Sequence, residues 1–143
     1  MSQLDYILGL DYGEKRIGVA IAHSIARLPR PLVTLQHTAE VIESIQKLVA
    51  EEHAGLVVVG LPRSMDGGVQ SQARIVQDFA AELETRISVP IAFADETLTS
   101  VEAERILASR KGVKKFEKGD IDALSAALIL ERYFEEQPPG LPS

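Results

Sequence analysis

The chain has 143 residues, of which 45% are hydrophobic, and it contains no cysteine. This length suits one domain with a sizeable core, expected over residues 1–136, followed by a disordered tail over residues 137–143. The lack of cysteine excludes disulfides, thiol catalysis and cysteine-based zinc sites. No apolar run approaches membrane-spanning length and no apolar leader follows the first residues, so we expect a cytoplasmic protein that uses no membrane. The formal net charge is −6, whereas nucleic-acid-binding domains are usually basic overall or on one face.

The first predicted element is a short buried strand, residues 6–10, that runs straight into Asp11. Gly13 then marks a reversal into a second strand over residues 17–22, and a third strand is expected at residues 32–35. These three strands predict a meander. A carboxylate fixed at the end of a buried strand suits a metal ion, while a turn-forming aspartate is the alternative interpretation.

The middle of the chain alternates helical and extended patterns. Apolar residues at helical spacing predict a helix over residues 41–49 with Gly55 as its C-cap, followed by a buried strand at residues 56–60. A second apolar stripe, from residue 73 to residue 87, predicts another helix before a strand at residues 90–94. Such β-α-β units imply parallel pairing with right-handed crossovers.

More acids follow at the ends of these later elements. Asp95 and Glu96 end the strand at residues 90–94, before a capping box that starts a helix at Thr99. The last helix is expected over residues 120–134 and to be largely buried, with Asp120 as its N-cap. Asp122 lies on an otherwise apolar helix face, so a capping role explains it less well.

Three clustered carboxylates repel one another unless a cation lies between them, and hard oxygen ligands select Mg²⁺ or Mn²⁺. Such a site suits phosphodiester cleavage, because metal ions about 3.5–4 Å apart activate water and stabilise the leaving oxygen without a side-chain nucleophile. The candidates are Asp11, Asp122 and one of the pair Asp95 and Glu96, since strand alternation lets only one of that pair face the site.

Four ordered motifs, which span nearly the whole chain, resemble the YqgF/RuvX family of ribonuclease H-like proteins. They lie at residues 9–20, at 59–62 with 65–67, at 95–96 with 98–103, and at 118–119 with Asp122 and 125–126. The family comprises pre-16S rRNA nucleases that were formerly described as Holliday junction resolvases. Two positions depart from its usual pattern: Thr97 stands where the family often has Arg, and Ser64 where Asn is frequent.

The resemblance implies an α/β ribonuclease H-like fold, with a five-stranded mixed sheet that forms an antiparallel meander and then parallel strands, flanked by helices. It also implies that Asp11, Glu96 and Asp122 form a catalytic triad that binds Mg²⁺ or Mn²⁺. The implied function is metal-dependent endonucleolytic processing of the 5′ end of pre-16S rRNA during ribosome biogenesis. Two alternatives stay open: a Holliday junction resolvase acting on branched DNA, and a non-catalytic RNA-binding module in ribosome assembly.

Basic residues gather in the segment 105–118, against a single acid, Glu117. An ordinary solvated loop is the alternative to a loop that grips a phosphate backbone. The candidate nucleic-acid contacts are Lys15, Arg16, Arg63, Arg110, Lys111, Lys114, Lys115 and Lys118. The expected partners are precursor rRNA or branched DNA, and pre-ribosomal particles, bound by a monomer or a homodimer. A resolvase cuts two strands symmetrically and therefore requires a two-fold dimer.

Other chemistries fit the sequence less well. The three histidines, at positions 23, 37 and 53, have no metal-ligand spacing. Residues 11–13 with Gly18 also resemble the phosphate loop of actin-like ATPases and sugar kinases. Those proteins bind a nucleotide between two lobes, whereas this chain is long enough for only one lobe. An ATP-binding phosphotransferase is therefore the weaker hypothesis.

Overall fold

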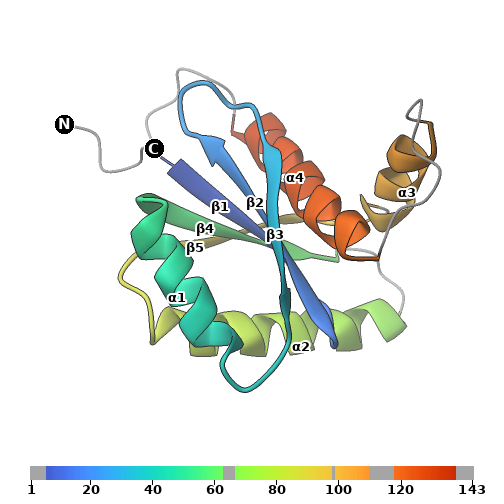
Figure 1. Ribbon diagram of the computed structural model, residues 1–143. Coiled ribbons are helices and arrows are strands. Elements are labelled where there is room, and N and C mark those ends of the chain that lie inside the picture. Colours follow the sequence, from blue (N-terminus) through green and yellow to red (C-terminus); the bar gives the residue numbers. More distant parts are fainter. Residues whose placement is uncertain (1–5, 63–66, 98, 110–117, 138–143) are drawn as a thin grey trace.

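A computed structural model describes residues 6–62, 67–97, 99–109 and 118–137 of the chain (Figure 1). It contains five strands and four helices in these ranges, and they follow the predicted order along the chain. Their bounds are β1 Tyr6–Asp11, β2 Arg16–His23, β3 Arg30–Gln36, α1 Val41–Glu51, β4 Ala54–Leu61, α2 Gly67–Glu84, β5 Ile91–Asp95, α3 Thr99–Ser109 and α4 Lys118–Glu136.

The strands form one mixed sheet in the order β3-β2-β1-β4-β5. The first three pair antiparallel, as a meander, and β1, β4 and β5 pair parallel. This arrangement confirms the predicted fold class. Because β1, β4 and β5 run in the same direction, their carboxyl ends lie at one edge of the sheet, where Asp11 ends β1 and Asp95 ends β5.

Alternation along the strands divides the core between two faces of the sheet. Leu8 and Leu10 of β1 pack on the side of α1 and α2, whereas Ile7 packs on the side of α4. Figure 1 shows α4 running along the sheet, with α1 and α2 on the opposite face. Since side chains two residues apart share a face, Asp11 belongs to the face that α4 covers. Residues 123–130 of α4 are all buried, as expected for a helix at the centre of this layer.

Helix α4 lies unusually close to the sheet at two glycines. A Cβ atom built on Gly18 would lie 2.0 Å from the carbonyl oxygen of Asp122, and one built on Gly60 would lie 2.4 Å from Cδ1 of Ile129. At Gly18 the clash is with helix backbone, so a side chain there would push the helix outward, whereas the end of the Ile129 side chain that faces Gly60 can shift aside. Gly18 is also the cross-strand partner of Asp11, so this close approach brings the start of α4 to the end of β1.

Two local predictions are wrong. Gly55 is not a C-cap, because α1 ends at Glu51 and Gly55 lies inside β4. The reversal falls instead on His53, which adopts a left-handed backbone with φ of 57°. Asp120 is not the N-cap of the last helix, since α4 begins at Lys118 and Asp120 lies within its first turn.

Three predictions fall wholly or largely on parts of the chain outside the described residues. They concern Ser64 in the second motif, the core of the basic segment at residues 110–117, and positions 138–143 of the tail. Within the described residues, no helix combines the length and apolar character needed to span a membrane.

A candidate catalytic site at the end of the sheet

The carboxyl groups of Asp11 and Glu96 meet at the carboxyl edge of the parallel strands. Asp11 is the last residue of β1, and the residue is only 8% exposed. Glu96 follows β5 directly, and its backbone N–H donates to the carbonyl oxygen of Leu61 at the end of β4, at 3.3 Å. The two side chains share a hydrogen bond. Strands β1 and β5, on either side of β4, therefore hold a buried acid and a partly buried acid together at one edge of the sheet.

Burial raises the pKa of the Asp11 carboxyl well above its ordinary value, and the adjacent Glu96 carboxylate and then Asp122 raise it further. Burial also raises the pKa of Glu96, and the neighbouring charge of Asp95 acts in the same direction, while the hydrogen bond with Asp11 opposes the shift. The pair is therefore poor at carrying two negative charges by itself, because low-dielectric surroundings and like charges both favour a shared proton. A cation between the oxygens would remove this penalty.

Asp122 lies close enough to Asp11 for its negative charge to raise the pKa of Asp11, but the Asp122 carboxylate is itself bound to another residue. Arg16, at the start of β2, donates from Nε to Oδ2 of Asp122 at 2.7 Å. The two side chains are 28% and 22% exposed, so this ion pair borders solvent. Helix α4 and strand β2 are thus joined by a charged contact directly beside the buried Asp11 and Glu96 pair.

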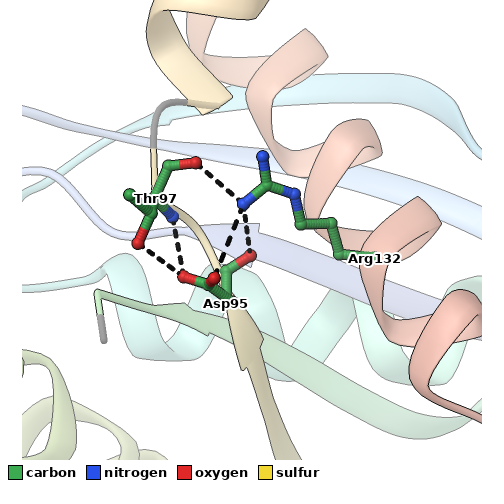
Figure 2. Close-up of polar contacts among 3 residues, drawn as sticks. All are labelled: Asp95, Thr97 and Arg132. Carbon is green, nitrogen blue, oxygen red and sulfur yellow. Dashed lines mark hydrogen bonds and ion pairs between the residues drawn. The ribbon is translucent and has the colours of Figure 1, made fainter. Parts of the chain in front are cut away.

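Asp95 and Glu96 have different partners, as Figure 2 shows for Asp95. The Asp95 carboxylate accepts hydrogen bonds from the backbone N–H of Thr97 at 2.9 Å and from its hydroxyl at 2.6 Å. The guanidinium of Arg132 on α4 lies on the other side of Asp95, with 3.8 Å between Nη1 and Oδ2. Of the two neighbouring acids, Glu96 is the one that meets Asp11.

The donor set fits a hard divalent cation in its chemistry, since it consists of carboxylate oxygens with no thiolate. As arranged here, no group of three acidic or histidine side chains among the described residues is positioned to hold an ion, and Asp122 is bound to Arg16. One further polar atom lies nearby on α4. The hydroxyl of Ser125, one helical turn after Asp122, is fully buried and has no hydrogen-bond partner in the described part of the chain.

Aromatic rings support the turn that follows Asp11. The ring of Tyr12 packs against His37 and Phe79, with centroids 5.1 and 4.9 Å away. Nδ1 of His37 lies 2.7 Å from the carbonyl oxygen of Gly13, so this ring nitrogen carries a proton and donates it. These contacts fix the turn without placing an imidazole among the acids.

The structure places only part of the predicted nucleic-acid surface. Lys15 is exposed in the turn between β1 and β2, and Arg16 borders the acids. Lys118 opens α4, four residues before Asp122. The remaining candidates lie outside the described residues: Arg63, Arg110, Lys111, Lys114 and Lys115.

Sequence reasoning included Ser125 in the fourth motif but missed Arg132. Arg132 stands beside Glu131 near the end of α4, where charged residues are ordinarily solvated, so the sequence carries no signal of its contact with Asp95.

Solved structures share this fold at low sequence identity. "T. thermophilus RuvC in complex with Holliday junction substrate" matches with a TM-score of 0.56 at 11% identity, covering 92% of this chain and 96% of that one. The yeast mitochondrial Holliday junction resolvase matches with a TM-score of 0.54 at 11% identity, covering 92% and 78%. The chain therefore has the ribonuclease H-like fold of RuvC-type resolvases.

Sequence comparison defines the family. The family model RuvX, described as Holliday junction resolvase, matches residues 5–136. A relative from Crocosphaera subtropica is 40% identical over 136 residues, covering 94% of this chain and 95% of its own length. One from Pectobacterium carotovorum is 43% identical over 133 residues, covering 92% and 96%. Each is named "Putative pre-16S rRNA nuclease". The chain belongs to the RuvX family, which confirms the resemblance of its four motifs.

Proposed function

We propose that this protein is a metal-dependent nuclease that hydrolyses phosphodiester bonds at the site formed by Asp11, Glu96 and Asp122. The observation that carries the proposal is the buried, hydrogen-bonded pair of Asp11 and Glu96 at the end of the sheet. A buried acid held against a second, partly buried acid costs the fold free energy, and catalysis with a divalent cation is the use that explains this cost. The nuclease names of its relatives support the same class of reaction.

Asp11 and Glu96 would hold Mg²⁺ or Mn²⁺, with Asp122 as the third ligand. When bound, the ion supplies a Lewis acid that activates water and stabilises the leaving oxygen. Asp11 is fixed by the rigid end of β1, and Glu96 by the backbone bond to Leu61, so both acids are oriented before the substrate arrives. Arg16 holds Asp122 in place and offers a guanidinium to an approaching phosphate.

The substrate that we favour is precursor 16S rRNA, processed at its 5′ end in the cytoplasm during ribosome biogenesis. The curated relatives at about 40% identity carry the name of a pre-16S rRNA nuclease. A phosphate backbone is the feature that the basic residues recognise, so Lys15, Arg16 and the segment from Arg110 to Lys118 would contact RNA through charge and shape.

The test is cleavage of a precursor 16S rRNA fragment by wild type, Asp11→Asn and Asp78→Asn, with Mg²⁺ and with EDTA. Asp78 is exposed on α2 and provides a matched control for the same chemical change. We expect Mg²⁺-dependent cleavage by wild type and Asp78→Asn, and none by Asp11→Asn. Binding without turnover, equal in wild type and Asp11→Asn, would favour the non-catalytic RNA-binding module instead.

A Holliday junction resolvase is the second candidate, favoured by the description of the RuvX family model. Cleavage of a synthetic four-way junction, measured beside the rRNA fragment, separates the two substrates. A resolvase also has to be a two-fold dimer in solution, because it cuts two symmetric strands. A monomer that cleaves the RNA and leaves the junction intact would exclude this second candidate.

A further inference from the structure

Arg132 contacts the residues on both sides of Glu96. Its Nη1 donates to the carbonyl oxygen of Thr97 at 2.8 Å and to that of Asp95 at 3.5 Å, and it lies 3.8 Å from Oδ2 of Asp95 (Figure 2). A single guanidinium nitrogen thus holds two carbonyl groups and a carboxylate. Glu96 lies between them in the chain.

The turn at residues 95–97 is closed from within as well. Oδ1 of Asp95 accepts the backbone N–H and the hydroxyl of Thr97, so the Asp95 side chain fixes the turn while Arg132 fixes the turn to α4. These contacts leave the backbone at Glu96 little freedom. The positive charge of Arg132 also lies beside Asp95, the acid whose negative charge disfavours ionised Glu96.

The same helix carries Asp122 near its start and Arg132 ten residues later. Helix α4 therefore positions one acid directly and another through the turn that Arg132 holds. Because a helix moves as a rigid unit over this length, the spacing between Asp122 and Glu96 depends on the contact at Arg132.

We propose that Arg132 is a positioning residue for Glu96, which it holds beside Asp11 by anchoring the turn at residues 95–97 to α4. Two ionised carboxylates repel each other, and a chain segment that follows a strand end is free to swing toward water unless something retains it. The backbone bond from Glu96 to Leu61 is one such restraint, and Arg132 supplies a second on the far side of Glu96. The inference rests on the proposed function, in which Glu96 is a metal ligand, and it makes the metal affinity of the site depend on Arg132.

The experiment compares full-length wild type, Arg132→Gln, Arg132→Lys and Arg27→Gln. Arg27 is a matched control because it also ties α4 to the rest of the fold, with Nη2 donating to the carbonyl oxygens of Phe134 and Gln137, at the end of α4 far from Asp122. The first readout is the melting temperature of the protein alone against Mg²⁺ concentration. The second is kcat and KM on the precursor 16S rRNA fragment.

We expect Arg132→Gln to need about 10–100-fold more Mg²⁺ for the same rise in melting temperature, the usual effect of losing a residue that orients a ligand. Its kcat should fall while KM changes little. Arg132→Lys keeps the charge on a shorter side chain and should be intermediate. Arg27→Gln should lower the melting temperature and leave the Mg²⁺ dependence as in wild type.

The same Mg²⁺ dependence in Arg132→Gln and Arg27→Gln would overturn the proposal, since Arg132 would then only stabilise the fold. If Arg132→Gln does not fold, a wild-type Mg²⁺ dependence of Arg132→Lys overturns it. Failure of the proposed function gives a different result: wild type itself would not respond to Mg²⁺, and Asp11→Asn would match wild type in cleavage.

Discussion

Arg16 donates to Asp122 across 2.7 Å, and this ion pair occupies an oxygen of the acid that we propose as the third metal ligand. In the metal-free protein the contact stabilises the start of α4 against β2. It also balances the charge of Asp122, which would otherwise repel the buried pair of Asp11 and Glu96 more strongly.

Replacing Arg16 with Gln should separate these two effects. We expect the metal-free variant to lose at most about 1 kcal/mol of unfolding free energy, because the pair borders solvent. The rise in melting temperature with Mg²⁺ should be larger than in wild type, since Asp122 no longer has a competing cation. The control is Lys47→Gln, which removes one positive charge from the exposed side of α1. A smaller Mg²⁺ response in Arg16→Gln than in Lys47→Gln would contradict the proposed ligand role of Asp122.

Replacing Asp11 with Asn should stabilise the protein without metal or leave it unchanged. The substitution removes a buried charge and its repulsion with Glu96. Thermal unfolding with and without Mg²⁺ checks this. Wild type should gain about 2.7 kcal/mol at a hundredfold excess of Mg²⁺ over Kd, while Asp11→Asn should respond little. A variant that melts well below wild type, together with a wild type that ignores Mg²⁺ and Mn²⁺, would indicate a turn-forming aspartate and support the non-catalytic module.

The raised pKa values of Asp11 and Glu96 predict a specific pH dependence of stability. Between the ordinary carboxyl pKa and the raised one, the folded state binds more protons than the unfolded chain, so stability falls as pH rises. Acidification from neutral pH should therefore reduce the stability deficit of wild type relative to Asp11→Asn, by about 1.4 kcal/mol for every tenfold gain in proton affinity on folding. Denaturant titrations of both proteins over this pH range measure the difference. A deficit that grows on acidification would mean that the pair is stabilised by its charges.

Replacing Gly18 with Ala should displace the start of α4. The added Cβ would lie 2.0 Å from the carbonyl oxygen of Asp122, and overpacking of this kind costs about 1–3 kcal/mol. Cleavage should fall further than stability, because Asp122 moves with the backbone. The matched control is Gly119→Ala, at the start of α4 itself. There the new Cβ would lie 3.6 Å from Thr34, which is an ordinary van der Waals contact. Equal activity of the two variants at a temperature where both are folded would show that Asp122 needs no such close approach.

The basic segment is tested by its salt dependence. Replacing Lys111, Lys114 and Lys115 with Gln should weaken RNA binding and reduce the slope of log affinity against log salt by about 0.7–0.9 for each phosphate group that the variant no longer binds. Fluorescence anisotropy with a labelled precursor rRNA fragment, over a range of salt concentrations, gives this slope. An unchanged slope would indicate that the segment is an ordinary solvated surface that makes no phosphate contacts.

The sequence predicts the strands and helices well because buried strands are short apolar runs and the helices repeat their apolar residues at helical spacing. It fails at helix ends: the pattern favours Gly55 as a C-cap, yet His53 takes the left-handed position. The acids at strand ends are predictable from their place after apolar runs. The partners of those acids are not, since Arg16 and Asp122 are 106 residues apart and only the folded chain brings them together.

Gly18 and Gly60 have a consequence for protein engineering. Exchanging glycine for alanine commonly makes a protein more heat-resistant, because the unfolded chain loses entropy. At Gly18 the added Cβ would force the helix and the sheet apart, and at Gly60 it would displace the side chain of Ile129. The close approach of α4 that brings Asp122 to Asp11 therefore makes Gly18 unsuitable for an exchange that elsewhere is a simple way to raise the melting temperature.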